Sequence, residues 1–346
     1  MKLTNTLAFA ALSSLALAAC DSGTSNGTVT IKAVGSSTVF PFAKKVSEEF
    51  ALNNPDFGSP IIESTGSGKG FTLFCAGAGA DTPSMTNASR RMKKGEFETC
   101  GANGVAEITE LQVGLDGIAF ASKQGGITMN LTPEAVYKAL AAKPYGKEQT
   151  AKNWSDIDPS YPNKPILVYG PPSTSGTRDA LKELILEAGC KADPAMKELK
   201  ESDEDRYDQI CTEVRSDGVF VETGENDNLI VSKLAANADA VGVFGYSYLE
   251  ENLDKVHGLS MNGVEPTYEN IASFTYPGAR PLFVYVKKSH LDAVPGLKQF
   301  VAQWAKMWKK DGPLAKIGLV ANPDDVMAAM DKASTEFPSL DGAELK

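Results

Sequence analysis

The feature that most constrains this chain is a turn of small polar residues that recurs between a predicted strand and a predicted helix. Residues 35–42 (GSSTVFPF), 63–70 (ESTGSGKG) and 171–179 (PPSTSGTRD) combine Gly with Ser or Thr, and residues 87–91 (NASRR) form a shorter version. Short β-branched runs and stretches with apolar residues at helical spacing alternate around these turns. This alternation predicts an α/β architecture.

The periodicity also predicts where the elements lie. The predicted strands are residues 29–34, 60–63, 107–113, 117–122, 165–169, 240–244 and 279–286, and the predicted helices are 42–52, 67–75, 91–100, 132–142, 177–187, 227–236 and 296–308. The sequence has no linker within residues 29–330 that would separate independent domains, so we expect two lobes joined by chain crossovers. Residues 337–346 are expected to form a loose end.

The turns share a binding chemistry. A helix start leaves several backbone N–H groups without partners and carries a partial positive charge, so it attracts anions. Small residues let an oxyanion approach the backbone, and Arg90 and Arg178 could each add a bidentate contact. The alternative is that each Ser or Thr only caps its own helix. Four such turns, two of them beside an Arg, favour a shared oxyanion site.

The N-terminal residues are typical of an exported protein. Residues 1–19 have one positive charge and an apolar run that is too short for a transmembrane helix, which predicts a signal peptide. The run ends in LAAC, so we expect Cys20 to be lipidated and residues 20–28 to form a tether; cleavage after the ALA of residues 16–18 is the alternative. Removing residues 1–19 changes the formal net charge from -10 to -11, because Lys2 is their only charged residue. This acidic balance argues against general nucleic-acid binding.

The remaining cysteines are expected to form disulfides, because an exported protein meets an oxidising environment. Four cysteines allow three pairings, and sequence proximity favours Cys75–Cys100 and Cys190–Cys211. A zinc site would need closer ligand spacing, and the sequence has only His257 and His290 besides. Both histidines are interpreted as surface residues, and no metal is expected.

The order of the turns resembles the PstS-type phosphate-binding proteins of bacterial ABC transporters. The matching motifs are GSSTVFP at 35–41, GSG at 66–68, ASR at 88–90 and SGTRD at 175–179, with WSDI at 154–157 and VGVFGY at 241–246 in addition. The resemblance covers about residues 29–314. It implies a type II periplasmic-binding-protein fold, with residues 29–112 and 283–346 as lobe 1, residues 113–282 as lobe 2, and the ligand cleft between them.

The resemblance also implies phosphate-binding residues. They are Thr38, Val39 and Phe40 in the first turn, Ser67 in the second, Ser89 and Arg90 at a third helix start, and Ser175, Gly176, Thr177 and Arg178 in lobe 2. Arg178 would be the charged clamp, replacing an Arg that some relatives carry where this chain has Pro171.

The position of Arg90 raises a question of selectivity. Some relatives have an Asp there that accepts the proton of hydrogen phosphate, and an unpaired carboxylate would disfavour sulfate. The acceptor in this chain must therefore lie elsewhere or be absent. Asp179, Glu63 and Glu222 lie near the motifs and are the candidates, although Asp179 is better interpreted as pairing with an Arg or capping its helix.

The implied function is high-affinity capture of inorganic phosphate in the periplasm and delivery to a membrane permease for import. We expect a monomer without cofactor or enzymatic activity that touches the membrane only through its lipid anchor. The alternatives are the same fold with sulfate, arsenate or a phosphonate as ligand, a fold kept for adhesion or signalling, and a secreted phosphatase. A phosphatase is disfavoured because the chain offers two histidines and no nucleophile motif of the G-x-S-x-G or S-x-x-K type on a plausible nucleophile.

Overall fold

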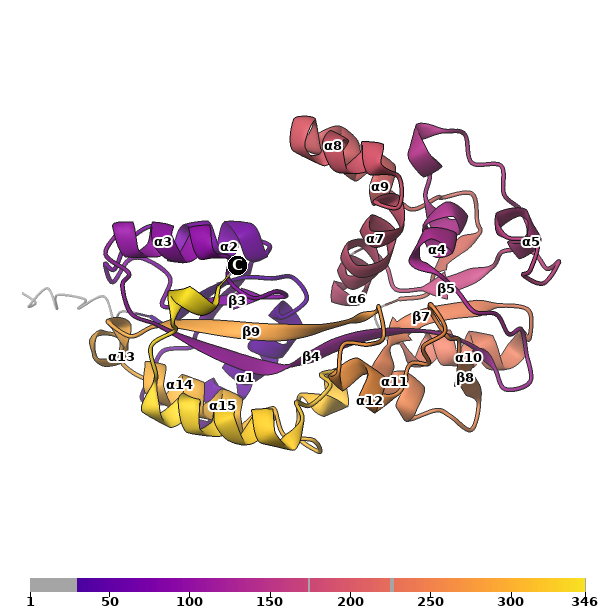
Figure 1. Ribbon diagram of the computed structural model, residues 1–346. Helices are drawn as coiled ribbons and strands as arrows, with labels where there is room; N and C mark the ends of the chain where they lie inside the picture. The colour runs from indigo at the N-terminus through magenta and orange to yellow at the C-terminus, as the bar shows by residue number, and fades with distance from the viewer. Residues whose placement is uncertain (1–29, 174, 225–226, 346) are drawn as a thin grey trace, which may run out of the picture.

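A computed structural model describes residues 30–173, 175–224 and 227–345. The predicted signal peptide, Cys20 and the tether lie outside the described residues. Among the helices within these ranges, none is long and apolar enough to cross a membrane. The predicted α/β class is confirmed: helices cover a mixed β-sheet in two lobes (Figure 1).

The described strands form one nine-stranded sheet that runs through both lobes. Its order is β2 (Ile61–Ser64), β1 (Lys32–Gly35), β3 (Met85–Ala88), β9 (Ala279–Lys287), β4 (Ile108–Lys123), β7 (Val241–Gly245), β5 (Val168–Gly170) and β6 (Phe220–Glu222), with β8 (Val256–Gly258) beside β4. The pairs β1–β2 and β1–β3 are parallel, as are β5–β6 and β5–β7, whereas β9 and β4 run antiparallel to their neighbours. The carboxyl ends of β1, β2 and β3 therefore meet at one edge, where the turns follow.

Lobe 1 packs helices from both ends of the chain around β1, β2 and β3. They are α1 (Phe40–Asn53), α2 (Ser67–Phe74), α3 (Lys94–Ala102), α13 (His290–Ala293), α14 (Leu297–Met307), α15 (Asp324–Glu336), and the 3-10 turns η3 (Ala315–Ile317) and η4 (Gly342–Glu344). Helix α1 buries Phe42, Val46 and Phe50, the spacing that predicted it. The ring of Phe50 meets Phe300 of α14 edge-on at 5.4 Å. An apolar stripe on each helix thus ties the start of the chain to its end.

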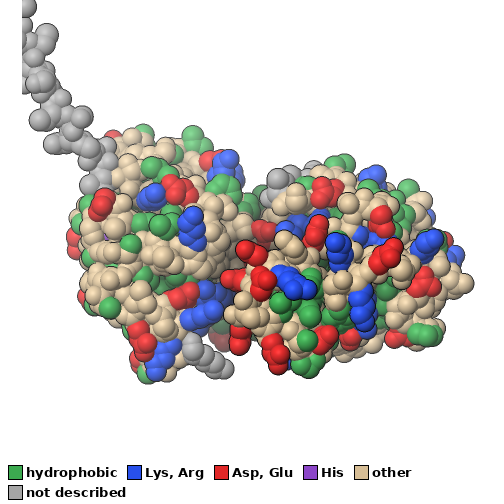
Figure 2. All heavy atoms as spheres, turned by 90° about the horizontal axis from the view of Figure 1, so that it is seen from above, with side chains coloured by type: hydrophobic (Ala, Val, Ile, Leu, Met, Phe, Trp, Pro, Cys, Tyr) green, Lys and Arg blue, Asp and Glu red, His purple; other side chains and the backbone are tan. Residues whose placement is uncertain are grey.

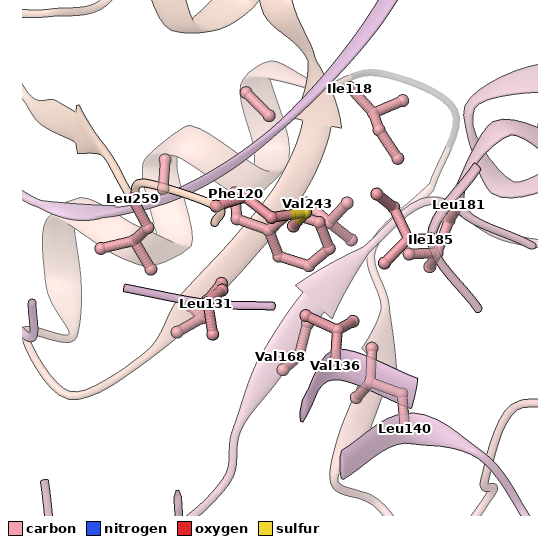
Figure 3. Packing of buried hydrophobic residues seen from close by; sticks show 14 of the residues in the cluster. Ile118, Phe120, Leu131, Val136, Leu140, Val168, Leu181, Ile185, Val243 and Leu259 are labelled. Carbon is pink, nitrogen blue, oxygen red and sulfur yellow. The ribbon is translucent and has the colours of Figure 1, made fainter. Parts of the chain in front are cut away.

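Lobe 2 has its own core around β5 and β7, in which Phe120, Val168 and Val243 pack against α4 and the helix after α6 (Figure 3). Its helices are α4 (Pro133–Leu140), α5 (Trp154–Ile157), α6 (Gly176–Ala180), the π-helical η2 (Leu181–Leu186), α7 (Glu187–Cys190), α8 (Pro194–Ser202), α9 (Glu204–Cys211), α10 (Asn228–Ala236), α11 (Tyr246–Glu250) and α12 (Tyr268–Ala272), with the 3-10 turn η1 (Pro144–Gly146). The predicted cap of α4 is present, since Thr132 Oγ1 accepts from the amide of Ala135.

Two long strands, β4 and β9, cross between the lobes (Figure 1). Sequence periodicity divided β4 into two strands, and this division is wrong. The register shifts between Gln112 and Gly114, which interrupts the alternation of inward and outward residues without ending the strand. Along β4, Leu111 and Val113 pack in the core cluster of lobe 1, and the buried apolar residues from Leu115 onward pack in the cluster of lobe 2.

Both favoured disulfides are confirmed. Cys75–Cys100 joins the end of α2 to α3, and Cys190–Cys211 joins the end of α7 to α9. The prediction that both histidines lie at the surface is wrong for His290, which is 1% exposed and hydrogen-bonded to Ser84 and to the carbonyl of Ala78.

The expected loose end at residues 337–346 is also wrong for the residues that the structure describes. Phe337 and Leu345 are buried, and the amide of Leu340 donates to the carbonyl of Ile108. Apolar burial and this hydrogen bond together fix the segment against lobe 1.

Candidate functional site

The first turn leaves β1 through a glycine that no other residue can replace without displacement. Gly35 has φ +135°, and a Cβ on it would lie 2.1 Å from the carbonyl oxygen of Asn87. The amide of Phe40 donates to the carbonyl of Ser36, and that of Val39 to Ser36 Oγ. The two predicted backbone donors therefore have partners within the turn. The hydroxyl of Thr38 instead accepts from Arg280 Nη2 at 2.8 Å.

The second and the shorter turn are joined by their serines. Ser67 Oγ accepts from the amide of Ser89 at 3.1 Å and lies 3.2 Å from Ser89 Oγ. Arg90 makes a bidentate pair with Glu96, at 2.7 and 2.9 Å. The expectation that Ser89 and Arg90 stand at a helix start is wrong, because α3 begins only at Lys94 and these residues lie in the preceding loop.

The lobe 2 turn meets the first turn directly. Ser175 caps α6 by accepting from the amide of Thr177 at 3.2 Å. A Cβ on Gly176 would lie 3.0 Å from Thr38 Cα, so the starts of α6 and α1 touch. The hydroxyl of Ser37 donates to Asp179 across the same junction. The starts of α1 and α6, from the two lobes, are therefore in contact.

Arg178 faces away from this junction. Its guanidinium lies 4.3 Å from the ring centre of Phe220, and Nη1 donates to the carbonyl of Pro171 and to Glu222. Burial lowers the pKa of Arg178, with Glu222 opposing that effect. The side chain thus links Pro171 to β6, and it is not in the lining of either cavity described next.

Two cavities adjoin the junction, and each is lined by a different subset of the predicted phosphate-binding residues. The smaller, of about 150 Å³, is lined by Thr38, Ser175, Gly176, Thr177 and Asp116 among others. The larger, of about 670 Å³, is lined among others by Ser67, Ser89, Arg90, Glu183 and Arg280. Neither lining includes Val39, Phe40 or Arg178. Thr38, in the lining of the smaller cavity, accepts a hydrogen bond from Arg280, in the lining of the larger one. Figure 2 shows a waist between the two lobes with acidic and basic side chains along it.

Arg280 lies in the lining of the larger cavity and was not singled out in the sequence analysis. It is 7% exposed and bonds Thr38, Asp116 and Glu183. Burial raises the pKa of Asp116, and the charge of Arg280 opposes that rise. The signal in the sequence was a single Arg near the start of the otherwise apolar run ARPLFVYV, residues 279–286.

The three carboxylates considered as proton acceptors all have other partners. Asp179 accepts from Ser37, Glu63 pairs with Lys32 at 3.0 Å, and Glu222 pairs with Arg178 at 3.4 Å. Asp116 lines the smaller cavity instead. No group of His, Cys, Asp or Glu that could hold a metal ion occurs within the part of the chain that the structure describes.

Comparison with known proteins agrees with this geometry. Residues 21–305 match the model of a PBP superfamily domain. Protein SphX of Synechococcus elongatus is 33% identical over 75% of this chain and 68% of its own length. The phosphate-binding protein PstS of Staphylococcus saprophyticus is 28% identical, over 83% of this chain and 81% of its own. This chain belongs to the PstS-type family of the PBP superfamily.

Solved structures share the fold of this chain over most of its length. A crystal structure of a possible phosphate-binding protein from Planctomyces limnophilus matches with a TM-score of 0.69 and 26% identity, covering 89% of this chain and 98% of that one. A phosphate transport receptor from Vibrio cholerae matches at 0.56 and 19% identity, which shows the fold alone. The predicted type II periplasmic-binding-protein fold is therefore confirmed.

Proposed function

We propose that this protein binds inorganic phosphate between its two lobes and delivers it to the permease of an ABC transporter for import. The observation that carries the proposal is the junction of the α1 and α6 starts beside a buried arginine. Hydroxyls and helix starts from both lobes, with one fixed cation, suit a small oxyanion. PstS-type relatives named as phosphate-binding proteins support phosphate as that oxyanion.

The architecture also suits capture and release. The hydroxyls of Thr38 and Ser67 belong to one lobe and those of Ser175 and Thr177 to the other, while β4 and β9 link the lobes. Closure about these strands would exclude water from the anion, and reopening would release it at the permease. The acidic net charge is no obstacle, since salt screens surface charges over about 8–10 Å.

The proposal includes an exported protein held at a membrane by a lipid on Cys20, acting as a monomer in the periplasm. It needs no cofactor and includes no catalytic step. The family consists of binding components of transporters rather than enzymes, which supports this part of the proposal.

Calorimetric titration of phosphate into mature protein stripped of bound anion tests the function. We expect tight binding of one phosphate per chain, with sulfate, arsenate and a phosphonate competing more weakly. Absence of phosphate binding would contradict the proposal, and tighter binding of another anion would replace phosphate as the ligand. Release of phosphate from a generic phosphomonoester would instead support the enzymatic alternative.

A further inference from the structure

We propose that Arg280 is the cation that holds the bound anion, and that the carboxylate of Glu183 competes with the anion for the guanidinium. This inference rests on the proposed function and names the residues that carry it. It assigns the charged contact to a strand residue between the lobes rather than to the arginines in the turns.

The backbone position of Arg280 suits that role. It lies on β9 directly opposite Asp116 on β4, near the point where β4 leaves β9 to pair with β7 of lobe 2. Arg280 therefore lies on one of the two strands that link the lobes. A cation there contacts an anion that both lobes enclose, whichever lobe moves.

The contacts of Arg280 differ between Nε, which has a buried partner, and Nη1, which has a partner that an anion could replace. Nε donates to Asp116 at 3.1 Å, and the Asp116 side chain is only 15% exposed. Nη2 donates to the hydroxyl of Thr38, and Nη1 contacts Glu183. Asp116 thus fixes the plane of the guanidinium, and the two terminal nitrogens contact one residue of each lobe.

Glu183 is suited to leave when an anion arrives. Its side chain is 47% exposed, so its carboxylate can return to water, whereas leaving Asp116 or Arg280 buried without a counter-charge would be costly. It lies on the π-helical segment η2, and π-helical turns are frequent at functional sites. A carboxylate and a phosphate engage an arginine fork in the same way, so only one of them can occupy it.

The other two candidate arginines are already engaged. Both terminal nitrogens of Arg90 donate to Glu96, and Nη1 also donates to the carbonyl of Arg91. Arg178 is held by Phe220, Glu222 and the carbonyl of Pro171. Through these bonds, Arg90 and Arg178 contact only residues of their own lobe. Arg280 contacts Glu183 on η2 of lobe 2 and Thr38 in the first turn of lobe 1.

The first test is Arg280→Lys, which keeps the charge beside Asp116 but loses the fork. The matched control is Arg215→Lys, at an arginine that is 6% exposed and paired with Asp217 within lobe 2. Phosphate titration and the melting temperature without ligand are measured for both. We expect Arg280→Lys to weaken phosphate binding about 30-fold, as for loss of a charge-assisted contact. The control should bind within about threefold of wild type, although it also removes hydrogen bonds of a buried arginine and so lowers the melting temperature.

The second test is Glu183→Gln, which removes the competing charge from a half-exposed position. We expect phosphate to bind about three- to tenfold more tightly. Glu187→Gln is the control, because Glu187 lies one turn further along and also lines the larger cavity, but pairs with Lys191 and Lys200. Its effect should be smaller.

The outcomes distinguish this inference from the proposed function. If the wild-type protein binds phosphate and Arg280→Lys binds it with the same affinity, the role of Arg280 is overturned. Phosphate binding by the protein is then still supported. Unchanged or weaker binding in Glu183→Gln, or an equal gain in Glu187→Gln, overturns the role of Glu183. Failure of the wild-type protein itself to bind phosphate overturns the proposed function and this inference together.

Discussion

Replacing Gly176 with Leu should weaken phosphate binding by about 100-fold while leaving each lobe folded. The Cβ of a residue at this position would lie 3.0 Å from Thr38 Cα and 3.3 Å from the carbonyl oxygen of Ser37. Both are backbone atoms, so they cannot rotate away as a side chain could. The bulk would hold the starts of α1 and α6 apart and so prevent the closed state. Calorimetric titration gives the change in affinity, and far-ultraviolet circular dichroism reports the fold.

The control is Gly95→Leu, at a helical glycine of α3 where a Cβ meets nothing within 4 Å. It carries the same change in side-chain size and helix propensity but lies away from the junction. Equal affinities for Gly176→Leu and Gly95→Leu would show that the α1–α6 contact does not govern binding.

The second large effect is expected at Gly35. Gly35→Ala should lower the free energy of unfolding by about 3 kcal/mol or more, through backbone strain and a clash. The residue has φ +135°, and its Cβ would lie 2.1 Å from the carbonyl oxygen of Asn87, which also accepts from the amide of Ser36. The substitution must therefore separate β1 from β3 and shift the first turn. Urea denaturation followed by fluorescence measures the loss.

Gly125→Ala separates strain from clash, because Gly125 also has a positive φ, +72°, but a Cβ there meets nothing within 4 Å. Its expected cost is about 1 kcal/mol. If Gly35→Ala and Gly125→Ala lower the free energy of unfolding equally, the clash with Asn87 does not explain why residue 35 is a glycine.

Local patterns predicted the elements whose stability is local or strongly periodic. The apolar spacing in residues 42–52 identified α1, Thr132 marked the start of α4, and proximity paired the cysteines. Strand β3 was missed because its centre is polar: Thr86 and Asn87 are buried, with Thr86 Oγ1 bonded to the carbonyl of Val34 on β1. A strand held by such long-range contacts has no apolar alternation to detect.

The site shows the same division. The turns that carry Thr38, Ser67 and Ser175 were recognisable, because each follows a strand and lies at or just before a helix start. The contact of the Arg178 guanidinium with the Phe220 ring could not be predicted, because the residues are 42 positions apart and no local pattern relates them. Arg280 is further still from Thr38, by 242 positions, and only the pairing of β9 with β4 and β3 brings it to the first turn.

A crystal structure of the mature protein with phosphate tests the central claim most directly. We predict one phosphate between the lobes, contacted by Arg280, by the hydroxyl of Thr38 and by the 175–177 turn, with Glu183 turned toward solvent. An anion held by Arg178 or Arg90 while Arg280 stays paired with Glu183, or no anion between the lobes, would contradict it.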